Sequence, residues 1–517
     1  MNKRGIIVWS LLILGVLLMS CSNKKKVTIS ILIPEVESEQ LLIVYRAPNI
    51  ASISDVSGDT LYPNSKGRYS CTTPHPSVQV FLFELNSGET RCISSPLFIS
   101  SPGKYKIKLK NNPEQKELSV TNFEGHNQKG VMQFLDFVQF TRTNSTETKL
   151  NYQGPADSFM EHLGDEITRE LAPFVNFYDN VEIDDYFFNF ATQYISYWYA
   201  YQGLELINQN LKVTQKEELT EERELWLHHK EELTRSFPTK SAELQWSNHF
   251  EDYINEALYQ LIDQNRAEYD SALRQSSGQT WALSHIKSLI HPDLYPIYAL
   301  QYLSDKAMRL DIETITLFKE LQKAYPKYES YLSYKLLAEE KIPQIEKFNS
   351  KKADLASNQA IILDDEVAIT HFYQIRNRFY GEYLLVDVWA SWCPDCIAEF
   401  EHKEKVDSWL NAQQINSLYI ALERSPDRER WKKYISHYGL KGYHVLADNT
   451  LKQDLYNLLG TGSLWIPRYF LINPLGEIVA ADLPTPSHWE KFKKAIQSAM
   501  VVPIQENKKR GCDTLSF

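Results

Sequence analysis

The segment Leu384–Phe400, LLVDVWASWCPDCIAEF, leads from an apolar run directly into two cysteines separated by two residues. The apolar run that ends at Ala390 predicts a buried strand, and the residues from Cys396 onward have the spacing of a helix. Cys393 would then lie at the N-terminus of a helix that closely follows a strand. The segment therefore predicts a strand–loop–helix unit within an α/β fold.

Strands and helices continue to alternate after this segment. Strand-like runs such as INSLYIALE and YHVLA are separated by the helical run DRERWKKYISHYG, and PRYFLINPLGEIVAAD predicts a hairpin. We therefore expect a three-layer α/β domain over residues 355–503. A polar linker precedes this domain, and a polar tail occupies residues 504–517.

Residues 27–124 show a different pattern. Short runs such as VTISILI, QLLIVYRA and KYKIKLK are rich in β-branched or aromatic residues, and some alternate between apolar and polar positions. Clusters of turn-forming residues, such as SGDTLYPNSKG and LNSGET, separate these runs. We therefore expect an N-terminal antiparallel β domain, built as a small sandwich or barrel.

Helical spacing dominates residues 125–349, where prolines divide the region into several helices. One predicted helix carries aromatic residues at steps of three and four. Such a stripe can line a ligand groove, but its usual place is the contact between helices. We predict an irregular α-helical middle domain with the stripe in its core. The stripe consists of Phe187, Phe190, Tyr194, Tyr197, Trp198 and Tyr201.

The length and charge of the chain limit its class. A chain of 517 residues is long enough for about three domains, which agrees with the three patterns. The formal net charge is −11, and no basic stripe is interleaved with aromatic residues. Because binding to phosphate backbones needs a basic surface, a nucleic-acid partner is not expected.

Residues 1–21 have the features of an export signal. Lys3 and Arg4 precede an apolar run from Gly5 to Met19, and Cys21 follows at the end of that run. The run is short for a membrane span, which needs roughly 20 apolar residues. We expect a lipoprotein signal peptide with Cys21 as the lipid-attachment residue, so that the chain is anchored in the cell envelope and faces the periplasm. A retained signal anchor and an ordinary cleaved signal remain the alternatives.

Export changes the meaning of the remaining cysteines. Cys71 and Cys92 lie in the predicted β domain, and in an oxidising compartment they could form a structural disulfide. Separation along the chain says nothing about the distance between the two thiols, so both states stay open. Cys512 lies in the polar tail and is interpreted as an incidental free thiol.

The pair Cys393/Cys396 has three physical uses. A structural zinc site needs four ligands, but this region offers no second cysteine pair and only distant single histidines. A permanent disulfide over such a small loop would stabilise the fold little. Thiol–disulfide exchange needs one cysteine to attack and the other to resolve, and the predicted helix N-terminus would stabilise the Cys393 thiolate and lower its pKa. The pattern therefore favours a redox pair, with Cys396 as the less exposed resolving thiol.

At these residues the sequence resembles the thioredoxin superfamily, and most of all its membrane-tethered periplasmic thiol–disulfide oxidoreductases of the TlpA/ResA type. VDVWASWCPDC resembles their active-site strand and loop. The resemblance implies that Asp387 is a buried acid that accepts a proton from the resolving thiol. It also implies that Glu399 modulates the active-site thiols. The resemblance extends over residues 355–500.

The same resemblance assigns substrate-binding residues. WIPRYFLI resembles the cis-proline loop of the superfamily, in which the proline abuts the disulfide and the backbone of the preceding residue pairs with substrate. These positions are Pro467 and Ile466. Trp392 and Pro394, next to the first cysteine, complete the substrate-binding set that we expect.

The predicted function is reduction of disulfides in exported proteins by a Cys-Pro-Asp-Cys dithiol, which a membrane electron donor would keep reduced. No cofactor and no metal are expected. Asp395 lies between the cysteines, and its carboxylate would disfavour the thiolate and make the dithiol more reducing.

Other functions stay as alternatives. A thioredoxin-fold peroxidase would carry Thr where this chain has Ala390, and a copper-handling relative would use a wider cysteine spacing. A membrane-tethered binding module, in which the redox domain is secondary, is the alternative from another class.

Overall fold

The computed structural model describes residues 26–501, apart from residues 35–39, 75–78, 88–89, 144–149, 151, 217, 276, 358, 366, 424–426 and 461–463. The predicted signal peptide with its Cys21, and the polar tail at residues 504–517, therefore lie outside the described residues. No helix in the described ranges is both long enough and apolar enough to cross a membrane.

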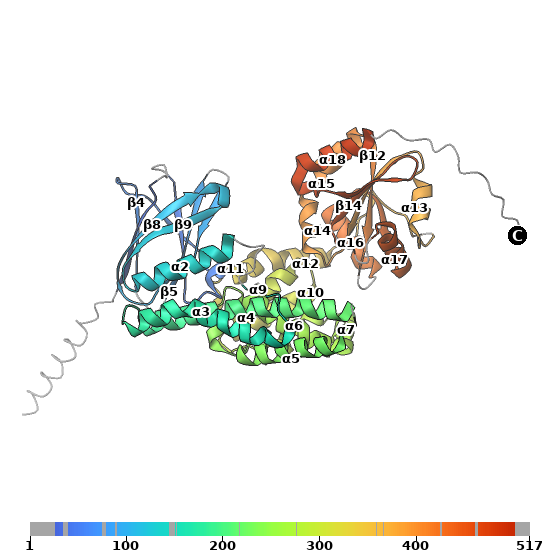
Figure 1. Cartoon of the computed structure of the whole chain (residues 1–517). Helices are drawn as coiled ribbons and strands as arrows, with labels where there is room; N and C mark the ends of the chain where they lie inside the picture. Colours follow the sequence, from blue (N-terminus) through green and yellow to red (C-terminus); the bar gives the residue numbers. More distant parts are fainter. Residues whose placement is uncertain are drawn as a thin grey trace, which may run out of the picture. The chain divides into compact units, whose positions relative to one another are not determined.

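The chain forms two compact units (Figure 1). The first comprises Met1–Tyr302 and Leu317–Leu336, and the second comprises Leu303–Thr316 and Leu337–Phe517. The second unit is thus larger than the predicted α/β domain, because it also includes residues 337–354 and the separate short segment Leu303–Thr316. Arg430 and Asn349 hold this segment with hydrogen bonds to the carbonyl oxygens of Arg309 (2.7 Å) and Leu310 (3.1 Å).

The first unit begins with a nine-stranded sheet in the order β3-β2-β5-β6-β9-β8-β1-β4, with β7 paired to β5. Alternation of buried and exposed residues is clearest in β8, where Tyr105, Ile107 and Leu109 are buried between exposed lysines. The strands are β1 (Lys26–Leu32), β2 (Leu42–Ala47), β3 (Asp59–Leu61), β4 (Arg68–Pro74), β5 (Gln79–Ser87), β6 (Thr90–Ser94), β7 (Leu97–Ile99), β8 (Gly103–Asn112) and β9 (Glu117–Glu124).

The sheet is mixed, which differs from the predicted antiparallel domain. Most pairs are antiparallel, but β1 runs parallel to β8, and β6 runs parallel to β9. Parallel neighbours need a long connection between them, and β1 and β8 are far apart in sequence. Local strand patterns could not reveal which distant strands become neighbours.

Cys71 on β4 and Cys92 on β6 are free thiols. Cys71 is half-buried and Cys92 is buried. Burial raises the pKa of both thiols, which keeps them protonated. The structural disulfide that the sequence left open is therefore not formed in this structure.

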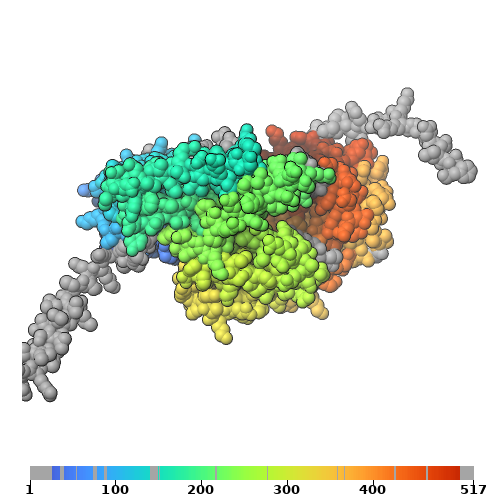
Figure 2. All heavy atoms as spheres, turned by 60° about the horizontal axis from the view of Figure 1, so that its bottom comes forward, coloured from blue at the N-terminus to red at the C-terminus, as the bar shows by residue number. Residues whose placement is uncertain are grey.

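Helices fill the middle of the chain, as predicted. Figure 2 shows part of the outer surface that these helices form, in green and yellow-green. The helices are α2 (Gln128–Thr143), α3 (Phe159–Asp179), α4 (Asp185–Lys216), α5 (Thr220–Ser236), α6 (Phe250–Gln264), α7 (Arg266–Arg274), α8 (Gly278–Ile286), α9 (Tyr295–Ala307), α10 (Ile312–Ala324), α11 (Leu332–Lys335) and α12 (Ile342–Ser350).

The aromatic stripe lies on α4, and the prediction that it belongs to the core is confirmed for all but one of its residues. Phe187, Phe190, Tyr194, Tyr197 and Trp198 are each at most 5% exposed, whereas Tyr201 is only half-buried. The ring of Phe190 stacks on Phe98 of β7, with 4.1 Å between the ring centroids. The stripe therefore joins the helices to the sheet.

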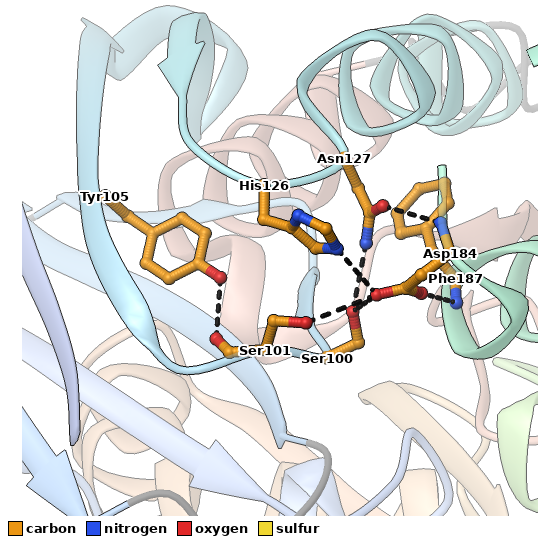
Figure 3. A network of polar contacts seen from close by, with 7 residues as sticks. All are labelled: Ser100, Ser101, Tyr105, His126, Asn127, Asp184 and Phe187. Carbon is orange, nitrogen blue, oxygen red and sulfur yellow. Dashed lines mark hydrogen bonds and ion pairs between the residues drawn. The ribbon is translucent and has the colours of Figure 1, made fainter. Parts of the chain in front are cut away.

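A polar network fixes the N-terminus of α4 to the loop after β7 (Figure 3). Asp184 accepts hydrogen bonds from the amide of Phe187 (2.7 Å) and the hydroxyl of Ser100 (2.6 Å). His126 Nε2 lies 2.9 Å from the same carboxylate, and Asn127 accepts the amide hydrogen of Asp184 at 2.9 Å. The carboxylate thus caps the helix and links it to the sheet.

The second unit contains a six-stranded sheet in the order β10-β13-β12-β11-β14-β15. Strands β10 to β13 run parallel, and β14 and β15 form the predicted antiparallel hairpin. The strands are β10 (Ala360–Ile362), β11 (Tyr383–Trp389), β12 (Ile415–Ala421), β13 (Gly442–Leu446), β14 (Arg468–Ile472) and β15 (Ile478–Leu483). The helices are α13 (Phe372–Arg378), α14 (Pro394–Glu399), α15 (Lys403–Ala412), α16 (Arg428–Tyr438), α17 (Asn449–Leu458) and α18 (Trp489–Val501).

Both faces of this sheet are covered. Leu384, Val386 and Val388 of β11 enter one buried apolar cluster, and Leu385 enters another. Successive side chains of a strand point to opposite faces, so the two clusters lie on the two sides of the sheet. The three-layer architecture predicted for this region is confirmed, and Asp387 points to the same face as Leu385.

Candidate active site

The two cysteines lie where β11 gives way to α14. Cys393 is the N-cap residue of α14, Pro394 is its first helical residue, and the two sulfur atoms are bonded to each other. Their Cα atoms are 5.3 Å apart, within the usual range of about 4.4–6.8 Å for a disulfide. The amide of Cys396 donates a hydrogen bond to Cys393 Sγ at 3.1 Å. The helix N-terminus therefore points a donor at the first sulfur.

The exposed surface of the pair is small and lies mostly on the first cysteine. Cys393 is 5% exposed and Cys396 is 1% exposed. Cys396 is thus the less exposed of the two cysteines, as the sequence predicts. Cys393 is itself mostly buried, although an attacking thiol needs to be accessible. In this disulfide form the small exposed surface of Cys393 is the part of the pair that a partner can reach.

Hydrogen bonds join the loop before the pair to the residues that follow the neighbouring strand β12. Glu423 accepts hydrogen bonds from the amide and the hydroxyl of Ser391, at 2.7 and 2.8 Å. The indole of Trp392 donates to the carbonyl oxygen of Leu422 at 3.1 Å. Burial raises the pKa of Glu423, against the hydrogen bonds from Ser391 that lower it. Sequence reasoning missed Glu423, although its place just after a parallel strand next to the active-site strand is a usable signal.

A cis peptide bond lies next to the first cysteine. The bond joins Ile466 to Pro467, just before β14. The carbonyl oxygen of Ile466 is 3.7 Å from Cys393 Sγ. The structure thus brings the predicted substrate-binding backbone next to the predicted nucleophile, although 73 residues separate them. Trp392 in the loop is half-buried, and Pro394 at the start of α14 is exposed; both are next to Cys393 in the chain.

Asp387 is buried in the strand that leads to the pair. One of its oxygens, Oδ1, has no hydrogen-bond partner, and the side chain lies opposite Tyr469 of β14 and Tyr419 of β12. Burial raises its pKa to about 8, while a hydrogen bond from Tyr469 acts in the opposite direction and the negative charge of Glu399 adds to the rise. Asp387 can therefore take up and release a proton near neutral pH.

Glu399 ends helix α14 and is held in place by a residue far along the chain. Its carboxylate accepts hydrogen bonds from the amide of Ser487 at 2.8 Å and from its hydroxyl at 2.7 Å. Through its charge, Glu399 raises the pKa of both Asp387 and Tyr469. Sequence reasoning named Glu399 and Asp387, but it missed Ser487 and Tyr469. Nothing local in the sequence marks Ser487.

In the part of the chain that the structure describes, no group of three or more His, Cys, Asp and Glu side chains is placed to hold a metal ion. His444, one of the distant single histidines of this region, is fully buried in β13 and stacks on Tyr419 with 5.0 Å between the ring centroids. Burial lowers its pKa to about 3, so the ring is neutral. The chemistry available at this site is that of two sulfurs, a buried carboxyl group and a backbone carbonyl.

Comparison with known proteins finds a match to the segment that carries the site. A thioredoxin-like family model matches residues 381–478, which include both cysteines, Asp387, Glu399 and the Ile466–Pro467 bond. A search of curated proteins found no significant match.

Among solved structures, the chain is similar to a thiol:disulfide interchange protein from a Bacteroides species, with 24% identity over 26% of this chain and 81% of that one and a TM-score of 0.20. It is also similar to the thioredoxin domain of a thiol-disulfide oxidoreductase from Bacteroides vulgatus, with 20% identity over 24% and 81% and a TM-score of 0.20. A thioredoxin-like protein from Bacteroides caccae matches with 15% identity over 40% and 86% and a TM-score of 0.17.

Proposed function

Because its C-terminal domain belongs to the thioredoxin superfamily, we propose that this protein is a thiol–disulfide oxidoreductase of the cell envelope, which reduces disulfides of exported proteins through Cys393 and Cys396. The observation that carries the proposal is the bonded pair at a helix N-terminus, with the carbonyl oxygen of Ile466 3.7 Å from the first sulfur. A permanent structural bond at this spacing would need neither feature.

In the reducing direction, the Cys393 thiolate attacks one sulfur of a substrate disulfide, and the bond between the two substrate sulfurs breaks. A mixed disulfide forms, and the second substrate sulfur leaves as a thiolate that takes up a proton. The Cys396 thiol then gives its proton to a base and attacks the Cys393 sulfur. This step forms the Cys393–Cys396 bond and releases the other substrate thiolate, so the substrate gains two electrons and the protein loses two.

Asp387 is the proposed base for the Cys396 proton. A base works best when its pKa lies near the working pH, and the pKa of Asp387 is about 8. Its unpartnered Oδ1 is free to accept a proton without first losing a hydrogen bond. Glu399 would tune this base through its negative charge, which it exerts on Asp387 from a position fixed by Ser487.

The direction of exchange and the location are supported by sequence features. Asp395 is an exposed residue between the two cysteines, and its carboxylate would disfavour the thiolate state. This favours a reductant, which a membrane electron donor would return to the dithiol form after each turnover. The export signal at residues 1–21, with Cys21 as the lipidated residue, supports anchoring in the envelope with the domains facing the periplasm.

The test uses the chain without its signal peptide. The reduced protein is expected to cleave the interchain disulfides of insulin, and Cys393→Ala is expected to abolish this activity. Cys396→Ala is expected to accumulate mixed disulfides at Cys393. A Cys71→Ala/Cys92→Ala double variant is the matched control, because it removes two thiols outside the site and should keep full activity. Insulin cleavage that survives Cys393→Ala, or that depends on the two control thiols, would overturn the proposal.

The reductant assignment has its own measurement. The equilibrium of the pair against glutathione is expected to give a potential well below about −150 mV. A value above this, near the strong oxidants of the superfamily, would reverse the assigned direction while leaving the exchange chemistry intact.

A further inference from the structure

One strongly exposed aromatic side chain lies directly beside the cysteine pair. Trp465 is 84% exposed, and it precedes Ile466, whose carbonyl oxygen is 3.7 Å from Cys393 Sγ. Because neighbouring Cα atoms are about 3.8 Å apart, the Cα atom that carries the indole is about 3.8 Å from the Cα atom of Ile466, the residue that contacts the reacting sulfur. In the described part of the chain, Trp465 is the most exposed tryptophan.

The residues on either side of Trp465 explain why its side chain stays outside. Leu464 and Ile466 both pack against the apolar cluster that includes Val386 and Val388. With its two neighbours directed into the core, Trp465 is left to point toward solvent. The indole is therefore held outward by an anchored backbone, so a partner would bind it with little loss of conformational freedom.

The residues directly before and after Cys393 are also apolar in large part. Trp392 is half-buried, and its indole nitrogen is tied to the carbonyl oxygen of Leu422 at 3.1 Å. Pro394 is exposed at the start of α14. On the Trp465 side, Arg468 is the first charged residue, and its guanidinium is paired with Asp482 at 3.1 Å. Apolar side chains thus flank Cys393 from two separate segments.

We propose that Trp465, Trp392 and Pro394 form a recognition rim, and that this rim selects protein disulfides whose cysteines are flanked by aromatic or aliphatic residues. Trp465 is its main specificity-determining side chain. The inference rests on the proposed function, because only a partner that brings a disulfide to Cys393 would engage the rim.

The chemistry of the rim also indicates the state of the partner. Aromatic and aliphatic residues next to a disulfide are normally buried in a folded protein. They become available to an exposed indole when the partner chain is unfolded or misfolded. Large apolar contacts of tryptophan dominate the binding energy of many interfaces, so one indole suffices to bias selection. The partner that binds the rim is therefore a non-native polypeptide that carries an accessible disulfide flanked by apolar residues.

The experiment compares two peptides that contain the same intramolecular disulfide, one with Phe and Leu next to the cysteines and one with Ser and Gly. The chain without its signal peptide is used in the reduced form, and kcat/KM is measured for both peptides. The native protein is expected to prefer the apolar peptide about tenfold. Trp465→Ala is expected to lower this preference about tenfold, and Trp465→Phe is expected to keep most of it.

The matched control is Tyr380→Ala. Tyr380 is 69% exposed in the same domain, and it precedes the N-terminal end of β11, whereas the cysteines follow its C-terminal end. This variant should keep the native preference. Equal loss on both peptides in Trp465→Ala, or an unchanged preference, would overturn the inference. A native protein that reduces both peptides equally well would refute the rim alone, whereas one that reduces neither would refute the proposed function.

Discussion

Asp184 is half-buried in the first unit and Asp387 is buried in the second, and their surroundings drive the two carboxyl groups to opposite charge states. Burial alone would raise the pKa of Asp184, but hydrogen bonds from Ser100, Phe187, Asn127 and His126 outweigh it and lower that pKa (Figure 3). Asp387 lacks such a set of donors, and burial raises its pKa to about 8. Two differences separate the carboxyl groups: Asp184 has more hydrogen-bond donors around it, and Asp387 is more completely buried.

This difference separates a structural role from a chemical one. Asp184 stays ionised and holds α4 against the loop after β7, so its charge is part of the fold. Asp387 weakens its own unit whenever it is ionised, and such a cost is typical of groups kept for function. Substitutions at the two residues test this comparison, because it predicts a loss of activity at Asp387 and a loss of stability at Asp184.

The largest expected effect is on the rate of exchange. Asp387→Asn should slow the reduction of a disulfide substrate by about 10²–10⁴-fold, because an amide cannot accept the proton of Cys396. The native rate should rise with pH as Asp387 ionises around pH 8, and the variant should lack this rise. Stopped-flow measurement of the single-turnover rate between pH 6 and 9 checks both. Asp184→Asn is the control and should leave the rate unchanged; an equal loss there would end the distinction between the two residues.

The next effect is on the stability of the second unit. The folded pKa of Asp387 lies above its unfolded value of 3.8, so the stability is fully present below about pH 4 and falls as the pH rises to about 8. Asp387→Asn removes this loss. Between pH 5 and pH 8 the native unit should lose unfolding free energy on the order of 3 kcal/mol that the variant keeps. Hydrogen exchange at the amides of Val386 and Val388 measures it. A native protein whose protection is equal at the two pH values would contradict the buried, neutral carboxyl group.

The third effect is on the first unit and has the opposite sign. Asp184→Ala removes a helix cap and leaves buried donors without an acceptor, which should cost about 2 kcal/mol at pH 7. Because the folded pKa of Asp184 is lowered, its contribution is present above the unfolded pKa and is lost as the pH falls below about 4. Hydrogen exchange at the first turns of α4 reports this loss. Asp185→Ala, at the next residue, is the matched control. An equal loss of protection there would contradict the specific role of Asp184 as the cap of α4.

The smallest effect concerns the loop before the pair. Glu423→Gln keeps the size of the side chain but replaces one of the two acceptor oxygens used by Ser391 with a donor group. The rate of exchange should fall about fivefold, which corresponds to roughly 1 kcal/mol for one weakened hydrogen bond. Glu429→Gln, on the exposed side of α16, should have no effect. A loss in both variants would trace to net charge and not to the loop.

The sequence was sufficient to predict the parts of the molecule that depend on local pattern. Alternating strands and helices predicted the architecture of the second unit, and the spacing on α4 predicted a core stripe. The network of Asp184 and the parallel pairs of the first sheet depend on residues brought together from far along the chain. Ser487 at Glu399 and Glu423 at Ser391 are of the same kind, with separations of 88 and 32 residues. Contacts between residues so far apart produce no local pattern in the sequence, so they could not be predicted from it.

The short segment Leu303–Thr316 has a practical consequence for the choice of fragments to express. A fragment that starts at the predicted domain boundary, residue 355, would contain both cysteines but would lack the carbonyl groups of Arg309 and Leu310. The guanidinium of Arg430 and the hydroxyl of Tyr434, both directed at the Arg309 carbonyl, would lose their acceptor. Expression of the isolated redox portion should therefore begin upstream of Leu303.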